Sequence, residues 1–254
     1  MGINVVKIRV IQINSKIPFM KSFKKIPFLL SLIFMCLLFQ TASAQDTDDQ
    51  NTNNKQEEKI ETSTQVLKDF SEMKDEIPQE LLKISQGIIV VPKLINAGFV
   101  LAGKRGKGIA MVRLEDGSWS NPVFVTITGG SVGFQIGVQA VDLVLIFKHR
   151  ETLQNIGKGS FTLGGDISVT AGPLGRSSTA STDTKFEAEV YSYSKSKGLF
   201  AGISLGGSEI AVDAKANEAF YGNDDDAETI FSDTTENSSD AVNDLKTELE
   251  NLYK

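Results

Sequence analysis

The densest group of side chains that could bind a ligand lies in a glycine-rich run near the middle of the chain. No acidic residue occurs between Leu81 and Leu114. Glycine turns can present backbone N–H groups to an anion, and basic residues near an anionic membrane attract it by about 1 kcal/mol each. We predict a lipid-headgroup site made of Lys93, Lys104, Arg105, Lys107 and Arg113, with a hairpin tip at residues 103–108. The alternative is a solvated hairpin whose charges protect a sheet edge from aggregation.

Residues suited to catalysis are few. His149 is the single histidine and lies between two cations. The run G-G-S-V-G at residues 129–133 has Ser131 between glycines, but it is expected to link two strands rather than the strand and helix of a nucleophile elbow. Asp142 has two interpretations: an acid or base with a raised pKa, or a carboxylate that satisfies backbone or basic groups. Cys36, the only cysteine, lies in an N-terminal apolar run. We predict a non-enzymatic protein without metal or cofactor, and keep a hydrolase using Ser131 and Asp142 as a third hypothesis.

A second informative stretch runs from Trp119 to Asp142 and joins two apolar, β-rich runs through Gly129 and Gly130. Beyond these glycines, strict alternation predicts a strand with an apolar and a polar face. Glycine inside a strand often marks close approach of a backbone or ligand, although it can also relieve crowding while glutamines satisfy buried backbone groups. The apolar face would hold Phe134, Ile136, Val138 and Ala140, and the polar face Gln135, Gly137 and Gln139.

The N-terminus has the features of an export signal. Three lysines between residues 20 and 25 precede the apolar run 26–39, and Ala42-Ser43-Ala44 follows. This order predicts a signal peptide within residues 1–44, cleaved after Ala44, with translation starting at Met1 or Met20. The alternative is an uncleaved anchor. We therefore expect an exported protein, either periplasmic or secreted, with peripheral attachment to a membrane as a further option.

Charge is unevenly distributed along the chain. The full sequence has a net charge of −6, and its first 44 residues carry six basic and no acidic side chains. Without them the net charge is −12, divided into −7 for residues 45–80, +5 for 81–208 and −10 for 209–254. A weakly basic centre thus lies between acidic ends. No aromatic residues interleave with the basic ones, so nucleic acid is not an expected partner.

Hydrophobic periodicity predicts a single α+β domain after a flexible polar linker at residues 45–56. Residues 57–74 have the spacing of an amphipathic helix, and 88–91 that of a buried strand. Residues 223–240 read as a mobile acidic loop, and 242–252 as a helical stripe that docks on the sheet or binds a partner. Further strands are expected at residues 109–114, 118–128, 132–140, 141–147, 161–170, 185–194 and 199–205, and short helices at 78–86, 151–155 and 211–220.

Several segments resemble the SYLF family of lipid-binding domains, in family order. They are residues 84–99, the run 103–108, the stretch 119–142, and the downstream motifs A-G-P-L-G-R, Y-S-Y-S-K-S-K-G-L-F-A-G-I-S-L and N-E-A-F-Y-G. The resemblance covers about residues 59–222, within a domain that we place at 57–222, followed by an acidic loop and helix at 223–254.

This resemblance implies a curved, mostly antiparallel sheet or barrel-like core flanked by short helices. It also implies affinity for phospholipid headgroups, which in eukaryotic relatives are phosphoinositides, and in some of those relatives for actin as well. The expected partner is a phospholipid membrane surface, reached by the basic hairpin and by apolar contact from helix 57–74. The alternative is an envelope adaptor that binds a protein partner.

Overall fold

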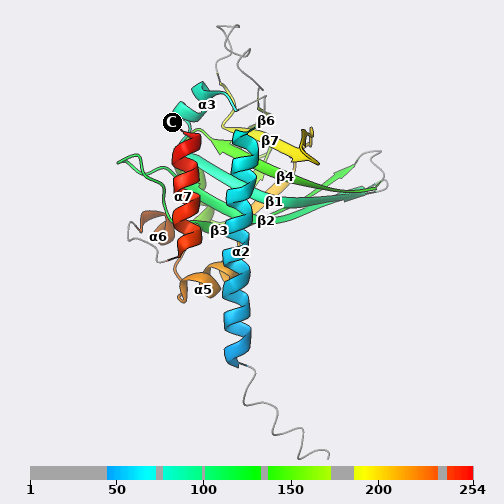
Figure 1. Cartoon of the computed structure of the whole chain (residues 1–254). Coiled ribbons are helices and arrows are strands. Elements are labelled where there is room, and N and C mark those ends of the chain that lie inside the picture. Colours follow the sequence, from blue (N-terminus) through cyan, green and yellow to red (C-terminus); the bar gives the residue numbers. More distant parts are fainter. Residues whose placement is uncertain are drawn as a thin grey trace, which may run out of the picture. The chain divides into compact units, whose positions relative to one another are not determined.

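The computed structural model of the chain describes residues 45–72, 77–98, 101–132, 137–172, 186–233 and 239–253 (Figure 1). Residues Asp48–Lys254 form one compact unit. The predicted signal peptide and Gln135 lie outside the described residues.

The predicted α+β class is confirmed: a curved, nearly closed sheet carries several helices. Its strand order is β5-β9-β3-β2-β1-β4-β7-β6, and β8 pairs with β7. Pairing is antiparallel except between β6 and β7. The strands are β1 (Gly87–Gly98), β2 (Leu101–Val112), β3 (Val123–Val132), β4 (Gly137–Phe147), β5 (Phe161–Leu163), β6 (Val169–Ala171), β7 (Val190–Ser196), β8 (Leu199–Phe200) and β9 (Ser208–Val212).

Both faces of the sheet are covered, which explains the continuous apolar run predicted as a buried strand. Ile88 and Val90 face a helix-side core, whereas Ile89 and Val91 face an inner core. Such two-sided burial gives a strand without polar alternation. Three helices cover the helix-side core: α2 (Gln45–Ser71), α3 (Gln79–Ile84) and α7 (Asp240–Leu252). The inner core includes residues of α4 (Arg150–Gln154), of the 3-10 helix η1 (Asn155–Lys158) and of α6 (Ala227–Ser232). Helix α5 (Ala214–Tyr221) follows β9.

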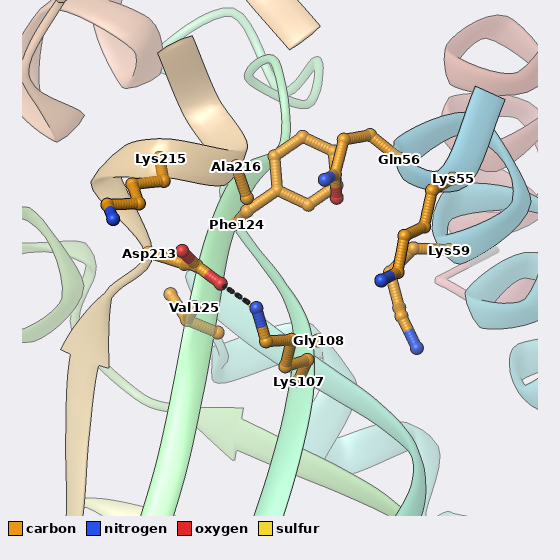
Figure 2. A pocket seen from close by; sticks show the side chains of 10 residues that line it. All are labelled: Lys55, Gln56, Lys59, Lys107, Gly108, Phe124, Val125, Asp213, Lys215 and Ala216. Carbon is orange, nitrogen blue, oxygen red and sulfur yellow. Dashed lines mark hydrogen bonds and ion pairs between the residues drawn. The ribbon is translucent and has the colours of Figure 1, made fainter. Parts of the chain in front are cut away.

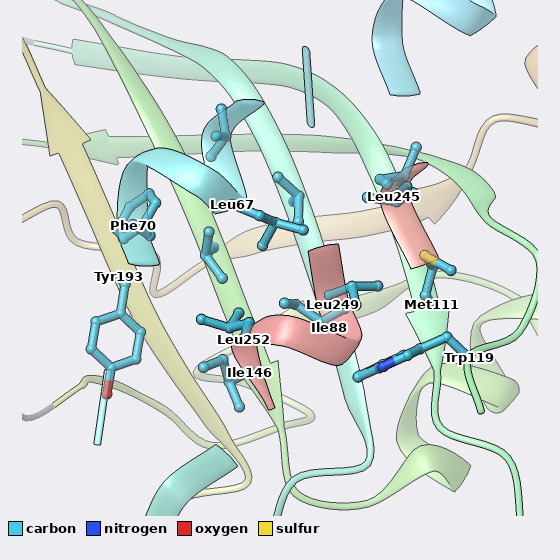
Figure 3. Packing of buried hydrophobic residues seen from close by; sticks show 14 of the residues in the cluster. Leu67, Phe70, Ile88, Met111, Trp119, Ile146, Tyr193, Leu245, Leu249 and Leu252 are labelled. Atoms are coloured by element: carbon cyan, nitrogen blue, oxygen red, sulfur yellow. The ribbon is translucent and has the colours of Figure 1, made fainter. Parts of the chain in front are cut away.

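Helices α2 and α7 lie side by side across the strands (Figure 1), and their apolar residues meet in the helix-side core (Figure 3). Leu67 and Phe70 of α2, and Leu245 and Leu249 of α7, are buried there. Trp119 packs edge-on against Tyr253, with 4.9 Å between ring centroids. The prediction that the C-terminal stripe docks on the sheet is therefore confirmed.

The helix predicted at residues 57–74 is confirmed, but it begins much earlier than expected. Residues 45–56, predicted as a flexible linker, are the first turns of α2. They contain neither proline nor glycine to stop the helix, and several acids favour its N-terminal end. The polar composition of this segment thus did not prevent helix formation.

The prediction of a hairpin tip at residues 103–108 is wrong. This run is the middle of β2 and pairs with both β1 and β3. Its glycines accommodate a register shift in β1 between Val90 and Ile95. A Cβ atom on Gly108 would lie 2.1 Å from the Val90 carbonyl oxygen, and one on Gly106 would lie 2.6 Å from Val91 Cγ1. The glycines thus mark close strand contact, not a turn.

Other boundaries also differ from the predictions. Gly129 and Gly130 do not link two strands but lie within β3. A Cβ atom on Gly129 would meet Ser208 Oγ of β9 at 2.6 Å, so close approach explains this glycine. The acidic loop predicted at 223–240 contains α6, whose first turn is capped by Asp226 accepting a 2.8 Å bond from Thr229 N.

Candidate functional site

A lysine-lined pocket of about 410 Å³ lies between α2, β2, β3 and the start of α5 (Figure 2). Lys55 and Lys59 project from α2 on one side, and Lys215 lies on the opposite side. Lys107 of β2 stands between them and contacts Asp213, with 2.6 Å between Nζ and Oδ2. Four lysines and one carboxylate line this lysine pocket, together with Gln56, Gly108, Phe124, Val125 and Ala216.

Lys55, Lys59 and Lys107 lie close enough for their charges to interact. Burial lowers the pKa of Lys59, and the positive charges of Lys93, Lys107 and Lys55 lower it further, against the opposing effect of Glu58. Repulsion of this kind shows that the cations share one electrostatic environment. Among the described residues, Lys55, Lys59 and Lys215 form no ion pair. An anion entering the pocket would relieve this repulsion.

An uncovered strip of the same sheet face continues outward from the pocket. Arg105 and Lys107 alternate with buried positions on β2 and are both exposed. Arg105 pairs with Ile95 of β1, whose side chain is 41% exposed. Val138 of β4, 77% exposed, pairs with Ala97 two residues further along β1. The strip therefore combines exposed apolar side chains with the guanidinium group of Arg105. Arg105 lies two residues from Lys107 of the pocket, which is about 7 Å along a strand.

The five basic residues predicted as a headgroup site do not form one cluster. Lys104 lies on the opposite face of β2 from Arg105 and Lys107, is 4% exposed, and donates to the Ser204 carbonyl. Desolvation lowers its pKa. Arg113 lies at the far end of β2, where its Nε donates to Gly117 O and its guanidinium sits 5.8 Å from the Tyr253 ring centroid. Strand alternation, which a hairpin tip would lack, separates these side chains.

Lys93 remains near the pocket but serves the backbone as well. It has a φ of 53° at the irregularity of β1, and its N–H donates to Asp142 Oδ1 at 3.0 Å. Asp142 thus accepts a backbone hydrogen bond, as the structural one of its two interpretations expects. Gly137 and Gln139 belong to β4 and pair with Gly98 and Asn96 of β1.

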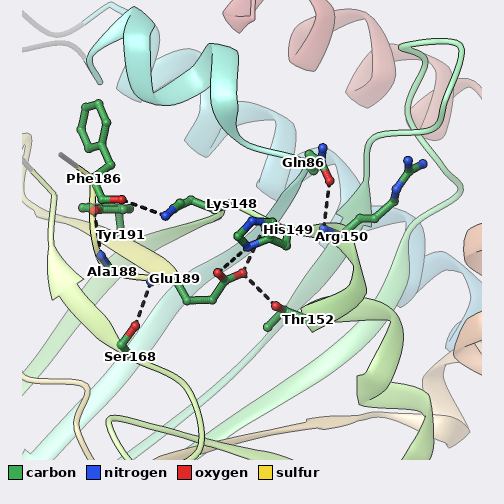
Figure 4. Close-up of polar contacts among 10 residues, drawn as sticks. All are labelled: Gln86, Lys148, His149, Arg150, Thr152, Ser168, Phe186, Ala188, Glu189 and Tyr191. Carbon is green, nitrogen blue, oxygen red and sulfur yellow. Dashed lines mark hydrogen bonds and ion pairs between the residues drawn. The ribbon is translucent and has the colours of Figure 1, made fainter.

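His149 is engaged far from the serine of the hydrolase hypothesis. Its Nδ1 lies 2.7 Å from Glu189 Oε2, and the other oxygen of Glu189 accepts from Thr152 (Figure 4). Ser131 lies in register with the Gly98 end of β1, whereas β4 reaches His149 at the Gly87 end. Eleven residues of strand separate these ends, on the order of 35 Å. His149 cannot act as a base for Ser131.

Sequence reasoning missed three of the four lysines that line the pocket. Lys55 and Lys59 belong to the acidic segment 45–80, and Lys215 lies about 100 residues beyond the end of β2. The available signal was the spacing of Lys55 and Lys59, which places them one turn apart on α2. Their meeting with Lys107 depends on the long-range pairing of β2, β3 and β9.

No group of three or more histidine, cysteine, aspartate or glutamate side chains in the described part of the chain is placed to hold a metal ion. No helix in the same ranges is long and apolar enough to cross a membrane.

Comparison with known proteins shows one matching family and several similar proteins. Residues 128–252 match the Ysc84 family, described as a Las17-binding protein actin regulator. The chain is 40% identical over 159 residues to LAS seventeen-binding protein 3 of Saccharomyces cerevisiae, covering 61% of this chain and 34% of that protein. It is 36% identical over 180 residues to the human SH3 domain-containing YSC84-like protein 1, covering 68% and 52%.

A third relative gives a similar picture. The SH3 domain-containing YSC84-like protein 1 of Xenopus laevis is 39% identical over 170 residues, which cover 64% of this chain and 50% of the relative. The chain thus spans between about a third and a half of the length of these relatives. The name of the Saccharomyces cerevisiae relative describes binding, and the description of the matching family adds regulation of actin.

Proposed function

The chain carries a domain of the Ysc84, or SYLF, family, and on that premise we propose that it is a non-catalytic module that binds anionic phospholipid surfaces. The observation that carries this proposal is the lysine pocket, in which four lysines face one carboxylate. Its position beside the strip containing Arg105, Ile95 and Val138 adds apolar area that can enter the headgroup layer.

The energetic argument rests on local charge. Each basic residue close to an anionic surface contributes about 1 kcal/mol. The net charge of −12 beyond residue 44 opposes approach to such a surface, but charges further away than about 8 Å are largely screened at physiological salt. The pocket and the strip therefore dominate at contact, and binding weakens as salt is added.

The test is co-sedimentation of the full chain with vesicles of phosphatidylcholine alone or mixed with phosphatidylglycerol. Only the difference between the two vesicles is counted, so any contribution of the apolar run 26–39 cancels. Lys59→Gln with Lys107→Gln should weaken binding by about 2 kcal/mol, or roughly 30-fold. Lys68→Gln with Lys83→Gln makes the same charge change at exposed positions outside the pocket and should have a much smaller effect.

Two results would count against the proposal. Absence of any preference for anionic vesicles at low salt would refute phospholipid binding. Equal losses in the two double variants would show that net charge, and not the lysine pocket, controls association.

Binding of a protein partner is the second candidate function, favoured by the printed description of the matching family as Las17-binding and as an actin regulator. An acidic segment of a partner could use the same lysines. This candidate predicts a stoichiometric complex that the Lys59→Gln, Lys107→Gln variant disrupts, with no vesicle association.

We further propose that the protein is exported, on the basis of the lysines, apolar run and Ala42-Ser43-Ala44 site at its N-terminus. N-terminal sequencing of the protein recovered outside the cytoplasm should begin at Gln45. A product that retains the apolar run would instead indicate an uncleaved anchor.

A further inference from the structure

Asp213 is the only acidic residue among those that line the lysine pocket. Its carboxylate approaches Lys107 Nζ at 2.6 Å, and its side chain is only 13% exposed, against 54% for Lys107. Among the described residues, the other three lysines of the pocket have no ion-pair partner. The pocket therefore already contains one negative charge, placed on a lysine whose side chain is exposed to solvent (Figure 2).

The backbone of Asp213 is held firmly in this position. Its N–H donates to the Phe124 carbonyl of β3 at 2.9 Å, and its own carbonyl accepts from Ala216 N and Asn217 N at the start of α5. Asn217 is 3% exposed and accepts a 2.8 Å bond from Phe124 N, which ties the same turn to β3. Because the backbone of Asp213 is fixed on both sides, the ion pair separates by rotation of the Asp213 or the Lys107 side chain.

We propose that Asp213 is an internal counter-ion that competes with the ligand for Lys107 and sets the affinity of the pocket for anions. This inference rests on the proposed function, because it concerns the same site. A phosphate group that enters must displace the carboxylate from Lys107 or bind beside it against like-charge repulsion. Either route costs free energy, so weakly bound anions are rejected and only groups that also engage Lys55, Lys59 or Lys215 are retained.

The opposite role would give an opposite result. A carboxylate that merely positioned Lys107 for the ligand would be needed for binding, and its removal would weaken association. Because competition and positioning predict changes of opposite sign, one neutral and nearly isosteric substitution separates them. Asp213→Asn removes the charge and keeps the size of the side chain.

The experiment compares the full-length wild type with Asp213→Asn on phosphatidylcholine vesicles with and without phosphatidylglycerol. We expect Asp213→Asn to bind the anionic vesicles about fivefold more tightly, the upper range for an exposed ion pair. Glu218→Gln is the matched control, since it makes the same charge change on an exposed face of α5 outside the pocket. The gain should disappear when Lys107→Gln is added to Asp213→Asn.

A soluble probe separates the headgroup from the membrane surface. Glycerol 3-phosphate should reduce vesicle binding by Asp213→Asn at lower concentration than it does for wild type, if the pocket itself holds the phosphate. Competition that is equally weak for both proteins would overturn the assignment of Asp213 as the competitor in this pocket.

The failures of the two proposals differ. If wild type binds anionic vesicles and Asp213→Asn binds them equally or less well, the inference about Asp213 is wrong while the proposed function stands. An equal gain from Glu218→Gln would also overturn the inference, because the effect would then be one of net charge. If neither wild type nor Asp213→Asn prefers anionic vesicles, both proposals fail.

Discussion

Replacing Gly108 by alanine should disrupt the pairing of β1 with β2 at the centre of the sheet. A Cβ atom at this position would lie 2.1 Å from the Val90 carbonyl oxygen and 2.9 Å from Val91 Cα. Both neighbours are backbone atoms of β1, so no change of rotamer relieves the overlap. The strands must separate or shift, at the point where the register of β1 is already irregular.

The expected cost follows from this geometry. Overpacking of a core typically costs 1–3 kcal/mol, and an overlap with backbone lies at the upper end, about 3 kcal/mol. For a domain of this size, 1 kcal/mol shifts Tm by roughly 2–4 °C, so Tm should fall by about 6–12 °C. Gly106→Ala should cost less, since a Cβ atom there meets Val91 Cγ1 and Leu94 Cδ1, which are side-chain atoms.

Gly103→Ala is the control in the same strand. A Cβ atom on Gly103 has no neighbour within 4 Å among the described residues. Because alanine restricts the unfolded chain more than glycine does, this change should be neutral or stabilise by about 0.5 kcal/mol. Differential scanning fluorimetry of the three variants tests the order. Equal Tm values for Gly103→Ala and Gly108→Ala would refute the explanation that strand contact selects these glycines.

Two further predictions concern the helices that cover the sheet. Lys195 Nζ lies 2.6 Å from Asp69 Oδ2, and this hydrogen bond lowers the pKa of Asp69 below 3.8. The ion pair therefore stabilises the folded state above about pH 3.8, and this stabilisation is lost as the pH falls through the lowered pKa. Asp69→Asn should therefore reduce the acid sensitivity of Tm below about pH 4, and an unchanged profile would contradict this origin. Leu249→Ala should lower the free energy of unfolding by about 3 kcal/mol, because Leu249 is fully buried. Glu250→Ala, on the exposed face of α7, should change it little. Equal urea denaturation midpoints for the two variants would show that α7 does not contribute to the core.

Much of the fold was predictable where periodicity and burial agree. The stripe containing Leu67 and Phe70 predicted the buried face of α2, and the stripe containing Leu245 and Leu249 predicted that of α7. The predictions of turns failed at glycines, because glycine is typical both of a turn and of close contact between strands. Glycines at 103–108 and 129–130 are equally compatible with a turn and with close strand contact, and only the position of the neighbouring strand decides between them.

The candidate site was less predictable than the fold, because its lysines come from three distant segments. Clustering along the sequence brought Lys104, Arg105 and Lys107 together, yet a strand sends adjacent side chains to opposite faces. Lys104 therefore enters the sheet interior, while Lys107 meets Lys59 of α2 across the pocket. The register between β2 and β3, which places the start of α5 beside Lys107, is a property of the whole sheet and has no local signature in the sequence.

The position of Lys59 links ligand binding to the docking of α2. Ile60, the next residue, is fully buried in the helix-side core, so Lys59 reaches the pocket only while that turn of α2 is packed on the sheet. An anion that contacts Lys59 and Lys107 together therefore binds the docked helix and not a detached one. By linkage, such a ligand must stabilise the docked helix by the same free energy that docking contributes to its binding. Burial of Lys59 and repulsion from the neighbouring lysines, which together lower its pKa, act in the opposite sense and favour release of this turn when the pocket is empty. Burial of Ile60 thus favours docking of this turn of α2, whereas the charge of the adjacent Lys59 disfavours it. An anion in the pocket would neutralise that charge and leave the packing of Ile60 unopposed.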